Sequence, residues 1–315
     1  MSVKQTQLSD TLVMVRPVDF GFNEQTGGDN AFQHKPDVGE NVTEKALIEF
    51  QNMVDNLRSV GITTLVLEKG QHNKKTPDAI FPNNWFSTTA SGTLLVYPMY
   101  AENRRQERRI DDLTELLEAH NYSVNDTQIV GDFNETQEIL EGTGVLIFDH
   151  IHNRIFAAQS ERCHPEQLDR FATKRGYQEV YLFQTTSSHG TPIYHTNVMM
   201  SVGDGFAVVC ADSITDKEAY QTLKSALAID REVIEISMEQ TEKHFCANIL
   251  HVKNDQGQPY IIMSQSAYNG FTSSQKAQLE KYGTLLPNPI ETIEKIGGGS
   301  ARCMIAEVFL PKKVL

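Results

Sequence analysis

The sequence repeats one pattern of secondary-structure elements five times. Segments with apolar residues at helical spacing recur at intervals of roughly 50 to 60 residues. They begin near Val42, Glu102, Pro165, Thr215 and Ser273. Each is followed by one short β-like run, and two further runs come before the next helix. The predicted unit is therefore strand, strand, strand, helix, used five times.

The two ends of the chain complete this pattern. The β-like run 11–17 precedes the first helix without a hairpin partner, and the run 303–310 follows the last unit without a helix. If these two runs pair, the chain closes into a ring and protects strand edges that would otherwise be exposed. We therefore expect one α/β domain over residues 1–315. An ordinary α+β sheet of similar content is the alternative.

Charge and cysteine usage limit the partners and the compartment. The net charge of −13 argues against nucleic acid and anionic membranes, because both need a basic face. No apolar run approaches the length of a membrane span, and the first residues lack the apolar segment of a signal peptide. The four cysteines are widely spaced, which favours a reduced, cytoplasmic protein.

Cys303 stands behind a loop with almost no side chains, in the stretch GGGSARCM. A nucleophilic cysteine needs an approach path, a depressed pKa and a nearby base. Gly297, Gly298 and Gly299 would let a ligand come close and let backbone N–H groups point at it. Cys303 is therefore a candidate nucleophile, with a structural thiol as the alternative.

A base and an acid that orients it are found at two other predicted strand starts. His195 comes immediately before an apolar run, and Glu141 precedes another in LEGTGVLIFD. A carboxylate beside an imidazole fixes its tautomer and stabilises the imidazolium. The plainer alternatives are a hydrogen-bonded structural histidine and a solvated acid.

A third polar group lies in the stretch PDAIFPNNWFSTT. Asp78, Asn83 and Asn84 are bracketed there by two prolines and the only tryptophan. Adjacent asparagine amides offer donors and acceptors suited to an amide-like ligand. Proline, aspartate and asparagine are also the usual residues of a turn, which is the alternative interpretation.

Taken together, the motifs resemble those of the guanidino-group-modifying enzymes, which include arginine deiminases, dimethylarginine dimethylaminohydrolases and glycine amidinotransferases. The resemblance runs nearly end to end and is strongest to the citrulline-utilisation hydrolase branch. It implies the pentein fold, a five-bladed α/β propeller. The stretches that carry it are MVRPVDFGFN, PDAIFPNNWFSTT, EGTGVLIFD, YHTNVMMSVG and GGGSARCM.

The resemblance also implies a role for each matching residue. Cys303 matches the nucleophile, His195 the general acid and base, and Glu141 the acid of the family's glutamate–glycine–glycine turn, here Glu-Gly-Thr-Gly. Asp78 matches an aspartate that holds the substrate end. Arg162 falls where relatives carry an arginine for the substrate's α-carboxylate.

Two departures from the pattern bear on the substrate. Asn84 and Asn197 stand where arginine-acting relatives carry aspartates. A guanidinium is cationic and only donates hydrogen bonds, whereas a ureido group is neutral and presents a carbonyl oxygen. The substitutions therefore favour hydrolysis of citrulline to ornithine, carbon dioxide and ammonia through a covalent cysteine intermediate. Hydrolysis of arginine or a methylarginine, amidino transfer, and a non-catalytic binding module remain alternatives.

Few features of the sequence indicate a cofactor or a further partner. The implied mechanism needs no metal and no organic cofactor, and its partner is a small amino acid. His150 and His152 form an HxH pair and Cys163 adjoins His164, which is a weaker case for a metal site. The basic run 104–109 is interpreted as the solvated start of a helix rather than a phosphate site, with one of its arginines facing the central channel as the alternative. A homodimer is an open option for assembly.

Overall fold

Five small sheets of three strands each form the framework of the computed structural model, which describes residues 6–28, 30–70, 74–131 and 138–313. The first three sheets are β15 (Ala306–Glu307), β1 (Thr11–Val15) and β2 (Thr63–Leu67); β3 (Phe86–Thr88), β4 (Thr93–Val96) and β5 (Asp126–Ile129); and β6 (Ile147–Asp149), β7 (Arg154–Ala158) and β8 (Glu179–Phe183). The others are β9 (Met200–Val202), β10 (Phe206–Val209) and β11 (Glu232–Glu235); and β12 (Leu250–Lys253), β13 (Pro259–Ser264) and β14 (Thr284–Asn288).

Every sheet has the same internal topology. The middle strand pairs antiparallel with the first strand and parallel with the third. In four sheets the three strands follow one another along the chain, whereas the sheet of β1 takes its first strand from the other end of the chain. Leu12 pairs there with Glu307, and Val13 with Ala306. The expected pairing of the two terminal runs is therefore present.

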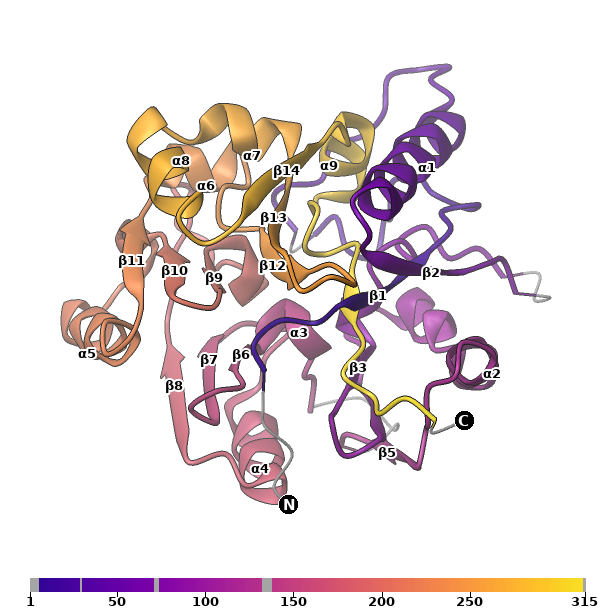
Figure 1. The fold of residues 1–315 in the computed structure, drawn as a ribbon. Coiled ribbons are helices and arrows are strands. Elements are labelled where there is room, and N and C mark those ends of the chain that lie inside the picture. Colours follow the sequence, from indigo (N-terminus) through magenta and orange to yellow (C-terminus); the bar gives the residue numbers. More distant parts are fainter. Residues whose placement is uncertain (1–5, 29, 71–73, 132–137, 314–315) are drawn as a thin grey trace.

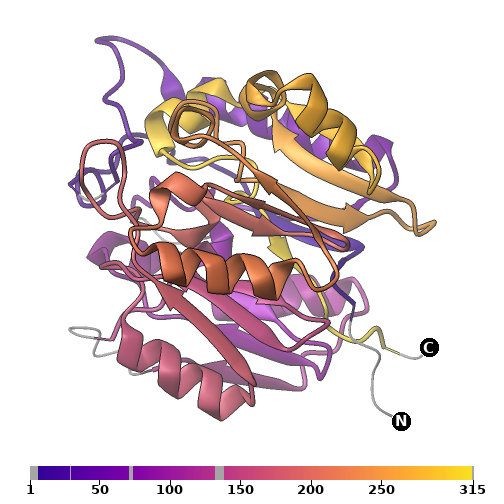
Figure 2. The same ribbon diagram turned by 90° about the vertical axis from the view of Figure 1, so that its left-hand side faces the viewer.

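One longer helix connects the second and third strands of each sheet. These helices are α1 (Val42–Ser59), α2 (Ile110–Ala119), α4 (Pro165–Arg175), α5 (Lys217–Leu227) and α8 (Ser273–Leu279). They lie on the outside of the molecule (Figure 1), and the turned view shows α4 and α5 in front of the strands (Figure 2). The helix α1 buries the apolar stripe expected from its spacing, which includes Phe50, Met53 and Leu57.

Shorter helices mark the places where the chain turns between strands. The α-helical ones are α3 (Gly142–Val145), α6 (Met238–Glu242), α7 (Gln265–Gly270) and α9 (Glu291–Gly297), and the 3₁₀ turns are η1 (Pro82–Asn84), η2 (Glu102–Glu107), η3 (Thr196–Val198) and η4 (Ala211–Ser213). No helix in the described part of the chain is long and apolar enough to cross a membrane.

Three expected boundaries are wrong. The helix expected near Glu102 starts as the 3₁₀ turn η2, because Arg104 and Glu107 point into the interior and pair there, and α2 begins only at Ile110. Residues 144–145 belong to the short helix α3 rather than to a strand. The run expected over 303–310 shortens to β15, because Cys303 lies in a turn and Arg302 donates to the carbonyl oxygen of Ile305.

Candidate active site

Polar residues occupy the same place in several sheets, just before the first strand. Asn84 precedes β3, Asn197 precedes β9, Asn248 precedes β12 and Cys303 precedes β15, each by two or three positions. Gly144 holds the corresponding place before β6. Because the sheets share one topology, this position brings side chains from distant parts of the chain to one location.

A cavity lies at this location. Its lining includes Asp78, Asn84, Arg162, His195 and Cys303, five of the residues singled out from the sequence. The other lining residues are Thr26, Asn30, Phe81, Arg104, Tyr194, Gly297 and Gly299. Of the four cysteines, all buried and free of disulfides, only Cys303 lines this cavity.

The loop that carries Cys303 depends on glycine. Gly298 ends α9 with a positive φ of 65°, a backbone region that favours glycine. A Cβ added at Gly297 would lie 2.7 Å from the ring of Phe81, and one at Gly299 would lie 2.9 Å from it. The N–H of Cys303 then donates to the carbonyl oxygen of Ser300 at 3.0 Å, which fixes the turn. The glycines therefore serve close packing at the cavity wall.

Two amide groups hold the thiol of Cys303. Nδ2 of Asn248 lies 3.2 Å from Sγ, and Nδ2 of Asn197 lies 3.5 Å from it. Oδ1 of Asn248 accepts from the backbone N–H of Arg302 at 3.0 Å, which fixes the orientation of its amide. Burial raises the pKa of Cys303, and the hydrogen bond from Asn248 opposes that shift. The resting thiol is thus protonated at neutral pH, in contrast to the depressed pKa expected of a free thiolate nucleophile.

His195, Glu141 and Arg162 form one buried charged cluster. Nε2 of His195 lies 2.8 Å from Oε2 of Glu141, and Nη1 of Arg162 donates to the same oxygen at 3.0 Å. The other oxygen accepts from the backbone N–H of Tyr100 at 2.9 Å. Burial opposes ionisation of Glu141, but the neighbouring Arg162 and His195 outweigh it and hold its pKa well below the usual value.

The imidazole of His195 is neutral in this setting. Burial lowers its pKa, although Glu141 acts in the opposite direction. An ionised carboxylate only accepts hydrogen bonds, so Nε2 carries the proton and Nδ1 keeps its lone pair. A neutral histidine with a free lone pair can take a proton from a thiol or from water.

Arg104 enters the cavity wall from η2 and is almost fully buried, so its interpretation as part of a solvated helix start is wrong. Its Nη1 donates to Oδ1 of Asn84 at 2.7 Å, and its Nη2 donates to Oε2 of Glu107 at 2.9 Å. Burial raises the pKa of Glu107 to about 7, against the effect of Arg104. Arg104 therefore forms hydrogen bonds both to Glu107, which lies outside the cavity, and to Asn84, which lines it.

Asp78 lies beside Arg104 in the cavity lining and carries an unsatisfied oxygen. Its Oδ2 accepts from Nδ2 of Asn23 at 2.7 Å and from Oγ1 of Thr26 at 3.1 Å. Its Oδ1 is buried and has no partner among the described residues. Burial raises the pKa of Asp78 in spite of Arg104, whose Nε lies 3.9 Å away. An unpaired buried acceptor of this kind is suited to an ammonium or N–H group of a ligand.

Of the expected site residues, Glu141, Asn83 and Asn197 do not line this cavity. The Oδ1 of Asn83 accepts from Nδ2 of Asn84 at 3.0 Å. Arg162 lines the cavity but is joined to Glu141, and its guanidinium also lies over the rings of Tyr100 and Tyr194. A substrate carboxylate would therefore share Arg162 with Glu141.

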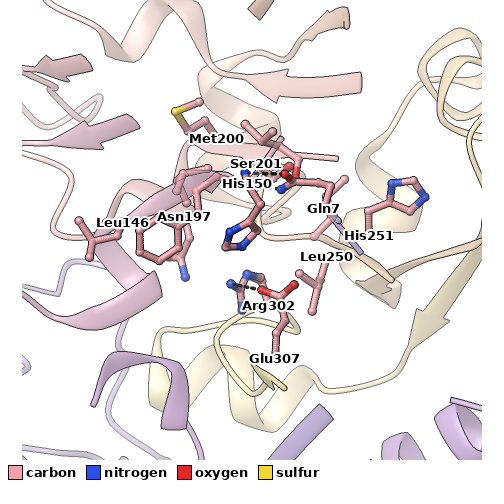
Figure 3. Close-up of a pocket in the computed structure, with 14 residues that line it drawn as sticks. Gln7, Leu146, His150, Asn197, Met200, Ser201, Leu250, His251, Arg302 and Glu307 are labelled. Carbon is pink, nitrogen blue, oxygen red and sulfur yellow. Dashed lines mark hydrogen bonds and ion pairs between the residues drawn. The ribbon is translucent and has the colours of Figure 1, made fainter. Parts of the chain in front are cut away.

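Asn197, expected at the substrate, lines a second cavity instead, where Arg302 forms an ion pair with Glu307 at 3.0 Å (Figure 3). His150 also faces this cavity, which is distinct from the one that Cys303 lines. No cluster of three or more histidine, cysteine or acidic side chains suited to a metal ion is found within the described ranges. Among the described residues, the HxH pair at His150 and His152 therefore has none of the further ligands that a metal site would need.

Comparison with known families supports the wider relationship that the motifs suggested, but not specifically the citrulline-utilisation hydrolase branch. Residues 16–310 match the family of the eukaryotic N,N dimethylarginine dimethylhydrolase. The chain belongs to this family. Membership of the dimethylarginine dimethylhydrolase family places it among the guanidino-modifying enzymes of the pentein superfamily. It makes the protein a hydrolase of carbon–nitrogen bonds other than peptide bonds.

Solved structures share the fold of this dimethylhydrolase-family chain. The N-terminal domain of ArgZ, an arginine dihydrolase of the cyanobacterial ornithine–ammonia cycle, was solved with its substrate and matches with a TM-score of 0.71 at 15% identity, over 97% of this chain and 99% of that one. Whole apo ArgZ matches with a TM-score of 0.72 at 14% identity, over 96% of this chain but only 41% of ArgZ.

A dimethylarginine dimethylaminohydrolase in adduct with S-methyl-L-thiocitrulline matches with a TM-score of 0.66 at 15% identity, over 96% of this chain and 100% of that one. At such identities the likeness shows the fold alone. No curated relative matches the sequence.

Two residues of the cavity region were missed in the sequence. Arg104 stands in a run of charged residues, and such runs are usually solvated. Asn248 stands in an apolar stretch, and nothing in its neighbours suggests a bond to Cys303. The repeat itself holds the signal for Asn248, because Asn84, Asn197 and Asn248 occupy equivalent positions before the first strands of their sheets.

Proposed function

We propose that the protein hydrolyses citrulline to ornithine, carbon dioxide and ammonia, with Cys303 as nucleophile. We also propose that the five sheets are the blades of one closed propeller that comprises residues 1–315 as a single domain. The pairing of β1 with β15 and contacts of β15 with β3, of β6 with β9 and of β9 with β12 support this arrangement. In such a ring the positions before the first strands converge at one end of the axis.

The reaction begins with attack of Sγ of Cys303 on the ureido carbon. His195 takes the thiol proton on Nδ1 and passes it to the side-chain nitrogen of ornithine as the carbon–nitrogen bond breaks. A carbamoyl group is left on sulfur as a thioester-like intermediate. Water then attacks its carbon and loses a proton to His195, and the carbamic acid released decomposes to carbon dioxide and ammonia. Glu141 stabilises the imidazolium in both steps.

The choice of substrate rests on one observation: the side chains of Asn84 and Asn197, near the thiol of Cys303, are uncharged amides. Asn84 lines the cavity and Asn197 contacts Sγ, at positions where a guanidinium would be better served by carboxylates. An amide N–H can donate to a ureido carbonyl oxygen. A carboxylate facing that oxygen would be left unpaired, at a cost of about 1–3 kcal/mol.

Arginine is the second candidate substrate. The free Oδ1 of Asp78 could accept from a guanidinium, and the similar fold of ArgZ belongs to an arginine dihydrolase. Arginine would give one ornithine and two ammonia by double hydrolysis, or one citrulline and one ammonia by deimination.

The test incubates the purified protein separately with citrulline, arginine and dimethylarginine. Ornithine and ammonia are then quantified. The proposal predicts equal amounts of ornithine and ammonia from citrulline, at a kcat/KM above that for the other two substrates. Absence of ornithine from citrulline, with turnover of arginine or dimethylarginine, would replace the proposal by the corresponding alternative.

A further inference from the structure

The buried guanidinium of Arg104 fixes the orientation of the amide of Asn84. Its Nη1 lies 2.7 Å from Oδ1 of Asn84. The oxygen and nitrogen of an amide are hard to tell apart by shape, but a guanidinium only donates hydrogen bonds. The amide atom that faces Arg104 must therefore be the oxygen, and Nδ2 must point the other way.

The side-chain NH₂ group of Asn84 consequently points toward His195 and the cavity. Nδ2 of Asn84 donates to Oδ1 of Asn83 at 3.0 Å, and it has no further partner among the described residues. A Cβ added at Gly144 would lie 2.6 Å from this Nδ2 and 2.9 Å from Nδ1 of His195. The second N–H of Asn84 is thus available beside His195, in a cavity that Cys303 also lines.

The guanidinium of Arg104 is held in this orientation because its other nitrogens also form hydrogen bonds. Nε donates to Oε1 of Glu107 at 3.1 Å, and Nη2 donates to Oε2 of the same residue at 2.9 Å. Nη2 also lies 3.2 Å from the carbonyl oxygen of Phe81. A bidentate pair of this geometry holds the guanidinium plane, and with it the direction of Nη1.

We propose that Arg104 is a specificity-determining positioning residue: it holds Asn84 with its NH₂ group toward the substrate and so selects a ureido carbonyl oxygen over a guanidinium. The inference rests on the proposed function, because it concerns the group at which that reaction occurs. A carbonyl oxygen accepts from the fixed NH₂ group. A guanidinium would place its own N–H groups against it and leave two donors facing each other without an acceptor.

The test compares the binding of citrulline and arginine by calorimetry in a Cys303→Ala background, where no turnover occurs. The double variant Arg104→Met/Glu107→Gln frees the amide and leaves no buried unpaired acid. We expect its preference for citrulline over arginine to fall by about 10-fold or more, because the amide can then present its oxygen. Arg104→Lys should keep most of the preference, since an ammonium also requires the oxygen of Asn84.

A matched control removes an exposed arginine–glutamate pair, as Arg16→Met/Glu68→Gln. It should leave the preference unchanged. If the Arg104→Met/Glu107→Gln variant weakens both ligands equally and keeps their ratio, Arg104 has a structural role only and the proposal is wrong. A preference for arginine in the background protein would also overturn it.

A second variant keeps the test decisive if the double variant does not fold. Asn84→Asp conserves shape and keeps a partner for Arg104, but replaces the donor by an acceptor. It should reverse the preference toward arginine, and an unchanged preference for citrulline would contradict the proposal. Failure of the proposed function is seen separately, as absence of ornithine when the wild-type protein is given citrulline.

Discussion

The Nε2 atom of His195 lies 2.8 Å from Oε2 of Glu141, in a site where both side chains are almost fully buried. A contact this close fixes the tautomer of the imidazole, because the carboxylate can only accept. The same oxygen accepts from Arg162, which keeps the carboxylate ionised. His195 is thereby held neutral and oriented, and it can serve as base and acid in turn.

Glu141→Gln should reduce turnover by about 100-fold or more, because an amide can donate to Nε2 and so favour the wrong tautomer of His195. The loss should be in kcat rather than in KM. Steady-state kinetics with citrulline measures both, and thermal unfolding of the same sample shows whether the fold persists. A variant with wild-type kcat would remove Glu141 from the mechanism.

Two buried histidines should make stability fall as the pH drops below about 6.5, the usual pKa of histidine, whereas Glu107, whose pKa burial raises to about 7, acts in the opposite direction. Burial lowers the pKa of His195 and lowers that of His251 to about 4, so the unfolded chain takes up protons first. Each group contributes up to about 1.4 kcal/mol per pH unit between its unfolded and folded pKa values. Below about pH 4.3 Glu141 adds to the loss, because its folded pKa lies below the usual value.

Urea unfolding between pH 7.5 and pH 4 measures this dependence. The variant His251→Asn should show a shallower fall of the free energy of unfolding with acid, because it lacks one of the protons. The same pH dependence in the wild-type protein and in His251→Asn would contradict the assignment of a neutral, buried His251.

Gly144→Ala should impair both activity and stability, because its new methyl group would meet Asn84 and His195 at the distances given above. Overpacking of this kind costs about 1–3 kcal/mol. Gly21→Ala is the matched control, since a Cβ there meets nothing within 4 Å. Denaturant unfolding and citrulline kinetics on the pair should separate them, and equal behaviour of the two variants would refute the close contact.

Asn248→Ala should raise the pKa of Cys303 further, because it removes the 3.2 Å amide donor to Sγ. The rate of alkylation by iodoacetamide, measured against pH, should shift to higher pH than in the wild-type protein. Asn254→Ala removes a buried amide that bonds to Val60 and Gln258 instead, and should leave the profile unchanged. An identical profile for both variants would show that Asn248 does not act on the thiol.

The repeat in the sequence predicted much of the framework because periodic apolar residues decide which faces are buried. The helices α1, α4 and α8 begin where the pattern expected them, and the terminal strands pair. The boundary near Glu102 failed because burial of Arg104 depends on Asn84, a partner distant in sequence. Local charge patterning cannot indicate that a single arginine in a basic run has such a partner.

The candidate site, too, could be predicted from the sequence only in part. Cys303, His195 and Asp78 come to one cavity from separate repeats, as the order of the motifs suggested. The thiol's raised pKa and the bond from Asn248 follow from burial and from side-chain geometry, which one sequence does not display. Arg162 was expected at the substrate, yet its pairing with Glu141 depends on how the third sheet folds.

Ornithine release from citrulline by Cys303→Ala, compared with Cys246→Ala, is the sharpest test of nucleophilic catalysis by Cys303. Both thiols are buried, but only Cys303 lines the cavity with His195. We expect no detectable ornithine from Cys303→Ala, although the protein stays folded, and wild-type release from Cys246→Ala. Sustained ornithine release by Cys303→Ala would show that the reaction does not pass through a carbamoyl group on the sulfur of Cys303.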